Sequence, residues 1–198
     1  MKFVVGIDEV GRGPLAGPVT TCVCVCDAAI YSTFKKSRLL PKRGIDSKKL
    51  SAREREAYAG ILKELAREKK ISYSVNHVSN KVIDSKGISY AIRKSIAAGI
   101  RKLKLDCRKC EVLLDGGLRA PVEFRKQRTI IKGDEKEHII AWASIVAKVS
   151  RDSLMERAGR RYPQYGFEVH KGYGTRQHRE AIRRYSPSPL HRRTWLAA

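Results

Sequence analysis

The chain has 198 residues and a basic composition, with 42 lysines and arginines against 20 acids and a formal net charge of +22. Such a charge repels itself in the folded state, so it favours a polyanionic partner, with nucleic acid ahead of an anionic membrane surface. No apolar run of about 18 residues occurs, which excludes a spanning helix. Only Met1 and Lys2 precede the predicted first strand. A signal peptide is therefore not expected, and the cytoplasm is the predicted location.

The first predicted element is a strand over residues 3–7 that is interrupted by two adjacent acids, Asp8 and Glu9. Neighbours on a strand point to opposite faces, so one carboxylate should face the core, where it is costly without a partner such as a divalent metal. The glycine-rich stretch Gly11–Pro18 follows and could bring backbone N–H groups close to a phosphate. A strand, a salt bridge and a turn without function fit the local pattern equally well.

Hydrophobic periodicity and capping residues predict the other elements. Ser51 is expected to cap a helix, because Glu54 three residues later completes a capping box. The predicted strands span residues 19–26, 71–78, 111–114 and 128–132, and the predicted helices span 52–70, 84–105, 135–161 and 175–185. Residues 28–45 and 162–174 are predicted to be loops, and residues 186–198 a tail whose Trp195 packs back on the domain.

The five cysteines suggest no metal site. Cys22, Cys24 and Cys26 alternate along a predicted strand, so they share one face and are interpreted as small buried thiols. Cys107 and Cys110 form an isolated CRKC, whereas zinc sites usually need a second pair or histidines at a fixed spacing. A zinc site or a disulfide at this pair stays open as the less favoured alternative.

Two more acids follow predicted strands. Asp115 ends the strand at 111–114, before two glycines, and Asp134 follows the strand at 128–132. Open α/β sheets place their sites at such strand ends, and oxygen ligands suit hard divalent cations. The alternatives are an acid that starts a turn for Asp115 and a helix cap for Asp134.

Asp152 competes with Asp134 for the fourth acidic position. If one helix joins them, they lie about 27 Å apart at 1.5 Å per residue, so they cannot share one site. Asp134 lies beside the other strand ends and is preferred. Asp152 is expected to pair with Lys148 or Arg151, or to cap local structure.

The run GIDEVGRGPLAGPV at residues 6–19 resembles the opening signature of the ribonuclease HII family, the type 2 ribonucleases H. Further stretches resemble the family in the same order along nearly the whole chain. They are DSKKLS at 46–51, LLDGG at 113–117, KGD at 132–134, ASIVAKVSRD at 143–152 and YGFEVHKGYGT at 165–175.

The resemblance implies an α/β fold like that of the ribonuclease H superfamily, with a five-stranded mixed sheet flanked by helices and a small helical C-terminal part. One catalytic domain would cover residues 1–198, with a helical and tail segment from about residue 162. The implied activity is a metal-dependent endonuclease that cuts the RNA strand of RNA–DNA hybrids. It would also nick 5′ to ribonucleotides embedded in duplex DNA, leaving 5′-phosphate and 3′-hydroxyl ends.

The resemblance also implies the site residues. Two Mg²⁺ or Mn²⁺ ions would be held by the four acids Asp8, Glu9, Asp115 and Asp134. Gly11, Arg12 and Gly13 would read the ribose 2′-hydroxyl through backbone atoms, Tyr173 would stack on the following sugar, and Lys48 would contact phosphate. Without the resemblance, Tyr173 is a structural loop tyrosine and Lys48 part of a solvated turn.

Three histidines in the C-terminal part, His170, His178 and His191, are interpreted as structural residues or phosphate contacts rather than metal ligands. The enzyme is expected to act as a monomer, without a membrane or an obligate protein partner. A ribonuclease HIII-like hybrid nuclease is the nearest alternative, and a non-catalytic basic nucleic-acid-binding protein is the alternative of another class. The acids at strand ends argue against the latter, because negative charge facing phosphate does not help binding.

Overall fold

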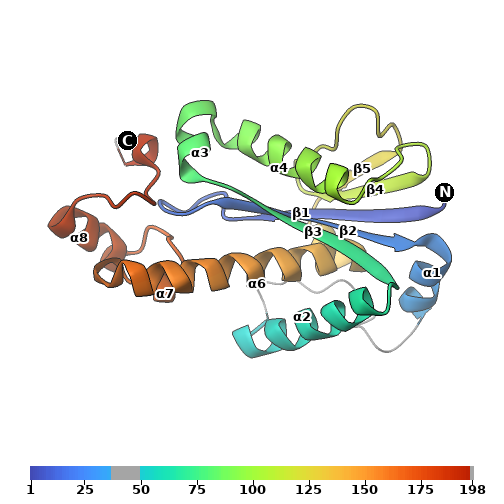
Figure 1. Ribbon diagram of the computed structural model, residues 1–198, viewed down its shortest axis with the longest axis horizontal. Coiled ribbons are helices and arrows are strands. Elements are labelled where there is room, and N and C mark those ends of the chain that lie inside the picture. Colours follow the sequence, from blue (N-terminus) through green and yellow to red (C-terminus); the bar gives the residue numbers. More distant parts are fainter. Residues whose placement is uncertain (37–49, 197–198) are drawn as a thin grey trace.

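The computed structural model describes residues 1–36 and 50–196 (Figure 1). Its strands are β1 (Phe3–Val10), β2 (Val19–Asp27), β3 (Ile71–Val78), β4 (Cys110–Asp115) and β5 (Gln127–Ile130). Its helices are α1 (Ala28–Lys36), α2 (Ala52–Arg67), α3 (Asn80–Lys86), α4 (Ile88–Lys102), α5 (Gly133–Lys136), α6 (His138–Arg161), α7 (Phe167–His170) and α8 (Arg176–Tyr185). Two short 3-10 turns complete them, η1 (Pro163–Tyr165) and η2 (Arg193–Trp195).

The strands form one mixed sheet in the order β3-β2-β1-β4-β5, which confirms the predicted five-stranded architecture. The first three strands in the chain are antiparallel neighbours, while β4 lies parallel to β1 and β5 parallel to β4. Helices α3 and α4 cover one face of the sheet, and α1, α2 and α6 lie on the other (Figure 1). No helix of the described residues is long and apolar enough to cross a membrane.

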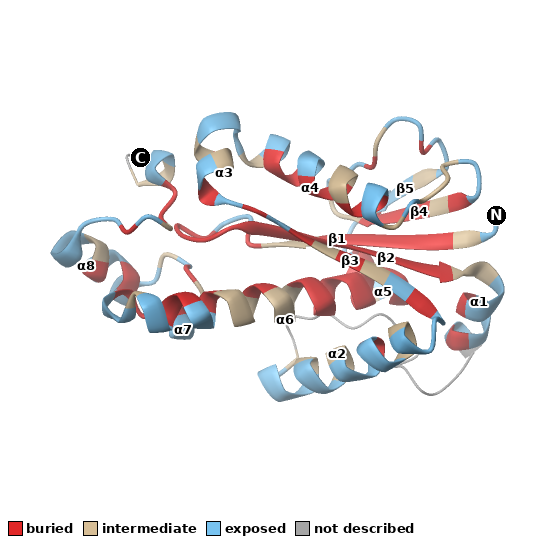
Figure 2. Cartoon of the chain, viewed as in Figure 1, coloured by how far each residue is buried: buried red, intermediate tan, exposed pale blue. Residues whose placement is uncertain are grey.

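Helix α6 packs closely on the central strand β1. A Cβ atom at Gly6 of β1 would overlap the backbone of Ile139, so only glycine lets the helix approach this near. Figure 2 shows the first half of α6 buried, whereas most of α2 is exposed. The Ser51 cap of α2 makes both hydrogen bonds of the predicted capping box with Glu54.

Two predicted helices and one predicted loop differ from the structure. The helix expected over 84–105 is two helices, because Gly87 has φ +80 and separates α3 from α4. The helix expected over 135–161 is broken at Glu137, between α5 and α6. Within the predicted loop at 162–174, residues 163–165 and 167–170 form η1 and α7.

The predicted loop at 28–45 was also wrong over its first part, since residues 28–36 form α1. The reason is tertiary, because Tyr31 and Phe34 both pack edge-on against Trp142, at 5.8 and 5.5 Å between ring centroids. Trp142 itself is buried in the core. Residues 37–45 lie outside the described part of the chain.

The remaining side-chain predictions concern cysteines and the tail. Cys22, Cys24 and Cys26 are buried on the face of β2 that packs in the same cluster as α6, as predicted. Trp195 packs on the cluster of the opposite face, which confirms that the tail folds back.

Candidate active site

Asp8 is the buried member of the adjacent acids, with 5% of its surface exposed. It lies on the α6 face of β1 and bonds the Ser144 hydroxyl. Burial raises its pKa well above the usual value, and the negative charges of Glu9 and Asp115 raise it further. A carboxylate held in this way has no apparent stabilising role and is suited to bind a cation.

Asp115 and Asp134 reach the same region from β4 and α5. The register pairs Ile7 with Leu114, so Asp8 and Asp115 are the next residues on two adjacent parallel strands. Asp115 accepts a hydrogen bond from the Gly133 N–H at 2.7 Å, which ties the turn bearing the buried Asp134 to the end of β4. Asp8, Glu9 and Asp115 thus lie at the ends of β1 and β4, and Asp134 follows the glycine that is bonded to Asp115.

The donor chemistry of these acids fits a hard divalent cation. Glu9 lies within 3.2 Å of the Arg12 guanidinium, an exposed partner that contributes little stability and could be exchanged for a metal. Within residues 1–36 and 50–196, no three His, Cys, Asp or Glu side chains are arranged as a finished metal cluster. Magnesium sites commonly use few protein ligands and complete the shell with water and substrate phosphate, so the acidic cluster is compatible with such a site.

Asp152 is engaged elsewhere. Its carboxylate bonds Lys148 Nζ at 2.9 Å, one turn earlier on α6, as the sequence predicted. Ser144 of the same helix contacts Asp8, and Asp152 follows it two turns later. Asp152 therefore has a local ion-pair role.

The glycine-rich stretch Gly11–Pro18 is held by two buried arginines. Arg151 of α6 donates to the carbonyls of Ala16 and Pro18 at 3.2 and 3.1 Å. Arg192 of the tail donates to the carbonyls of Gly11, Arg12 and Gly17 at 2.5 to 3.1 Å. Both guanidinium groups are fully buried, and burial, followed by the charge of Arg151, lowers the pKa of Arg192 to about 10.

The glycines of this stretch differ in what surrounds them. Gly11 has φ +86, and a Cβ atom there would meet Arg151 and the Pro18 carbonyl. A Cβ atom at Gly13 would meet nothing within 4 Å. The fold therefore requires glycine at position 11, whereas the open side of Gly13 leaves room for a ligand.

Tyr173 lies beside this stretch. The Gly172 carbonyl accepts hydrogen bonds from the N–H groups of Leu15 and Ala16, which joins the two loops. The Tyr173 side chain is 41% exposed, and the Arg151 guanidinium lies 5.9 Å from its ring centroid. An exposed ring at this position can meet a flat partner from solvent. Lys48 lies outside the described residues.

Sequence reasoning missed Arg151 and Arg192, because charged residues were taken to be exposed. For Arg151 a signal existed, since Ala147, Arg151 and Met155 recur every four residues on the buried face of α6. Ser144, the hydrogen-bond partner of Asp8, was also missed. Nothing in the local sequence of Arg192 indicates burial.

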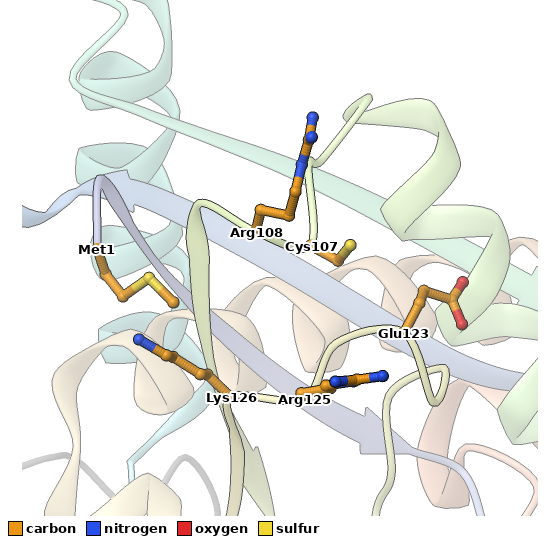
Figure 3. A pocket seen from close by; sticks show the side chains of 6 residues that line it. All are labelled: Met1, Cys107, Arg108, Glu123, Arg125 and Lys126. Carbon is orange, nitrogen blue, oxygen red and sulfur yellow. The ribbon is translucent and has the colours of Figure 1, made fainter.

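A pocket of about 400 Å³ lies away from the acids. It is lined by Met1, Cys107, Arg108, Glu123, Arg125 and Lys126, near the amino end of β1 (Figure 3). The charged side chains point in different directions instead of converging, and Arg108 pairs with Asp106. This pocket does not have the features of a binding site.

Comparisons with known proteins show the family and agree with the fold. The profile of the family described as Ribonuclease HII matches residues 5–198. The Ribonuclease HII of Caldicellulosiruptor bescii is 41% identical over 196 residues, which are 98% of this chain and 87% of that relative.

Two solved structures share the fold. The ribonuclease H2 from Pyrococcus horikoshii OT3 has a TM-score of 0.72 and 26% identity, covering 98% of this chain and 93% of that one. The Bst-RNase HIII structure in complex with Mn²⁺ has a TM-score of 0.59 and 18% identity, covering 93% of this chain and 63% of that one. The second likeness concerns the fold alone.

Proposed function

The chain belongs to the ribonuclease HII family, and we propose that it nicks duplex DNA 5′ to an embedded ribonucleotide. It is an RNA-cleaving endonuclease of the ribonuclease H type, and divalent-metal use is typical of this class. The proposed substrates are RNA–DNA hybrids and ribonucleotide-containing DNA duplexes, cleaved to leave 5′-phosphate and 3′-hydroxyl ends. The proposed working form is a cytoplasmic monomer.

The observation that carries the proposed site is the buried Asp8 carboxylate, whose pKa is raised by burial and by the neighbouring Glu9 and Asp115. We assign Asp8, Glu9, Asp115 and Asp134 as the ligands of Mg²⁺ or Mn²⁺. When bound, the cations supply the Lewis acidity that activates water and stabilises the leaving oxygen. Ser144 orients Asp8 toward this role.

The neighbouring loops supply recognition of the substrate. Gly11, Arg12 and Gly13 are proposed to present backbone groups to the 2′-hydroxyl, which is the group that distinguishes RNA from DNA. The exposed ring of Tyr173 is proposed to stack on the sugar that follows. Lys48 is proposed to contact a substrate phosphate.

The test is a cleavage assay on a DNA duplex with one ribonucleotide, with and without Mg²⁺ or Mn²⁺. Asp8→Asn and Asp134→Asn should each remove nearly all cleavage while leaving duplex binding in place, because the basic surface is unchanged. Asp152→Asn is the matched control and should retain most activity. Substantial turnover by Asp8→Asn would refute the metal-site assignment, and a larger loss in Asp152→Asn than in Asp134→Asn would show that the fourth acid is wrong.

A further inference from the structure

Three buried histidines form a cluster beneath Tyr173, on the side away from solvent. His178 of α8 is 0% exposed, His191 of the tail 1% and His170 of α7 8%. The rings of His170 and His178 are stacked at 4.2 Å, and Phe167 packs against all three. This cluster joins the C-terminal elements to the loop that carries Tyr173.

The hydrogen bonds of the pair His178 and His191 satisfy every backbone group in only one direction. The Ser188 backbone N–H donates to His191 Nδ1 at 2.9 Å, and the Ser188 hydroxyl lies 2.8 Å from the same nitrogen. This hydroxyl accepts the Leu190 N–H and keeps its own proton to donate, so His191 Nδ1 is an acceptor. Neutral His191 then carries its proton on Nε2, which lies 3.0 Å from His178 Nε2. His178 must accept there, and its own proton remains on Nδ1, 2.9 Å from the Tyr173 carbonyl oxygen.

The opposite direction leaves a backbone group without its hydrogen bond at both ends. A proton on His178 Nε2 would leave its Nδ1 lone pair facing the Tyr173 carbonyl, which cannot donate. His191 would then need its proton on Nδ1, where the Ser188 hydroxyl could accept it but the Ser188 N–H would lose its acceptor. This series of hydrogen bonds therefore requires both rings to be neutral and determines the tautomer of each.

The same cluster forms hydrogen bonds with the peptide groups around Tyr173. The Tyr173 N–H donates to the His170 carbonyl at 2.9 Å. The Gly172 N–H donates to His170 Nδ1 at 3.2 Å, while His170 Nε2 donates to the Tyr165 carbonyl at 2.6 Å. The backbone of Tyr173 is thus held on both sides by histidines, while its ring extends toward solvent.

We infer that Ser188, His191 and His178 form a directed hydrogen-bond chain that positions Tyr173 for the substrate, with His178 as a positioning residue. The inference rests on the proposed role of Tyr173 in substrate recognition. Protonation of either ring would place a second N–H against an existing donor and break the chain.

The surroundings of the pair favour the neutral rings. Burial lowers the pKa of His178 and of His191 to about 4. The hydrogen bonds with the backbone of Tyr173 and Ser188 act in the opposite direction, and the neighbouring charges add to the lowering. The titratable or charged groups that face the pair are His170 from α7, Arg179 on α8 and Tyr165 of η1, which packs on His191. The chain should therefore persist throughout the neutral pH range.

Nitrogen-15 NMR of the histidine rings in the substrate-free protein at pH 6.5 tests the hydrogen-bond chain directly. The protein has five histidines, so the spectrum can be assigned by single substitutions. His178 should be the Nδ1–H tautomer, and His191 and His170 the Nε2–H tautomer. A cationic ring at His178, or its Nε2–H tautomer, would overturn the inference.

Cleavage kinetics test the positioning role. His178→Asn keeps an N–H donor near the Nδ1 position and should retain most of kcat, whereas His178→Leu should lose activity on the order of tenfold to a hundredfold. His178→Leu combined with Tyr173→Ala should be no slower than Tyr173→Ala alone, because the two residues act through one ring. Additive losses would overturn the inference.

The two proposals fail differently. If Tyr173→Ala retains full activity, then the proposed recognition role of the ring is wrong, and the positioning inference is overturned with it. The tautomers measured in the free protein would still decide whether the hydrogen-bond chain itself exists. If Tyr173→Ala loses activity but His178→Leu does not, the recognition role stands and only the positioning inference is overturned.

Discussion

At the scale of single residues, the proposed site depends both on the charge of Asp8 and on the space that Gly13 leaves for a ligand. Asp8 is buried beside Glu9 and Asp115, an arrangement that raises its pKa and that stability alone would not select. A Cβ atom at Gly13 would meet no atom of the protein, so the packing of the fold does not require glycine there. Both features are explained by a ligand that approaches from solvent.

Gly13→Ala should therefore separate function from folding. The added methyl group meets no atom of the protein, so the free energy of unfolding should change by less than about 0.5 kcal/mol. Cleavage of a single-ribonucleotide duplex should fall on the order of tenfold or more, since a small displacement of the reacting group is costly. The measurements are the melting temperature and the cleavage rate.

Gly11→Ala is the contrasting variant, because φ +86 and the contacts with Arg151 make it a folding defect. Its melting temperature should fall clearly. Full activity of Gly13→Ala would mean that the substrate does not approach the backbone at this position.

At the scale of elements, the tail is tied to the glycine-rich stretch by Arg192, which donates to three of its carbonyls. Arg151 donates to two further carbonyls of the stretch from α6, so elements distant in sequence define one loop. Within the described part of the chain, the hydrogen-bond partners of both arginines are carbonyls and not carboxylates, so their positive charge beside the glycine-rich stretch favours an anionic substrate.

Arg192→Met should loosen this loop. It leaves buried carbonyls without donors, so the free energy of unfolding should fall by on the order of 3 kcal/mol, and cleavage should fall as well. Arg193→Met is the matched control, since Arg193 is the next residue and its side chain is exposed. The measurements are urea unfolding and the cleavage rate of both variants. Equal stability of the two variants would show that the Arg192 bonds do not hold the loop.

At the scale of the whole molecule, the net charge of +22 should govern binding. Exposed arginines on α8 contribute to the basic surface at the C-terminal end, and they are Arg176, Arg179, Arg183 and Arg184. The affinity for a duplex should fall steeply with salt, with a log–log slope of about −0.9 for each phosphate neutralised. Fluorescence anisotropy between low and moderate salt measures the slope, and a flat dependence would mean that the excess charge faces away from the substrate.

The whole fold should also lose stability in mild acid. His178 and His191 have a pKa of about 4 in the folded protein and about 6.5 in an unfolded chain. The unfolded chain therefore binds more protons between these values, and the free energy of unfolding decreases as pH falls through that window. Each ring should account for about 2 kcal/mol between pH 7 and pH 5.

Urea unfolding at pH 7 and pH 5 measures this loss. The double variant His178→Asn with His191→Gln lacks both titrating rings and should show a smaller pH dependence than the parent chain. The histidine account would be refuted if the parent and the variant changed in parallel.

The sequence by itself determined the sheet, the capping box and the acids at strand ends. These follow from alternation, from Ser51 with Glu54 and from the position of Asp115 after a buried strand, all of which are local patterns. The resemblance of the motifs added the family and the expected fold, which the comparisons confirm. The roles of Asp8, Gly13 and Tyr173 remain predictions that the experiments above address.

Only the tertiary structure decided which charged and titratable groups are buried, because burial depends on contacts between segments far apart in the chain. Arg192 lies 181 residues along the chain from the Gly11 carbonyl that it binds. The tautomer of His178 depends on its hydrogen bond with His191, which in turn accepts from Ser188. Helix α1 likewise forms where Tyr31 and Phe34 meet Trp142. No local periodicity contains these contacts, since each exists only once the chain has brought the partners together.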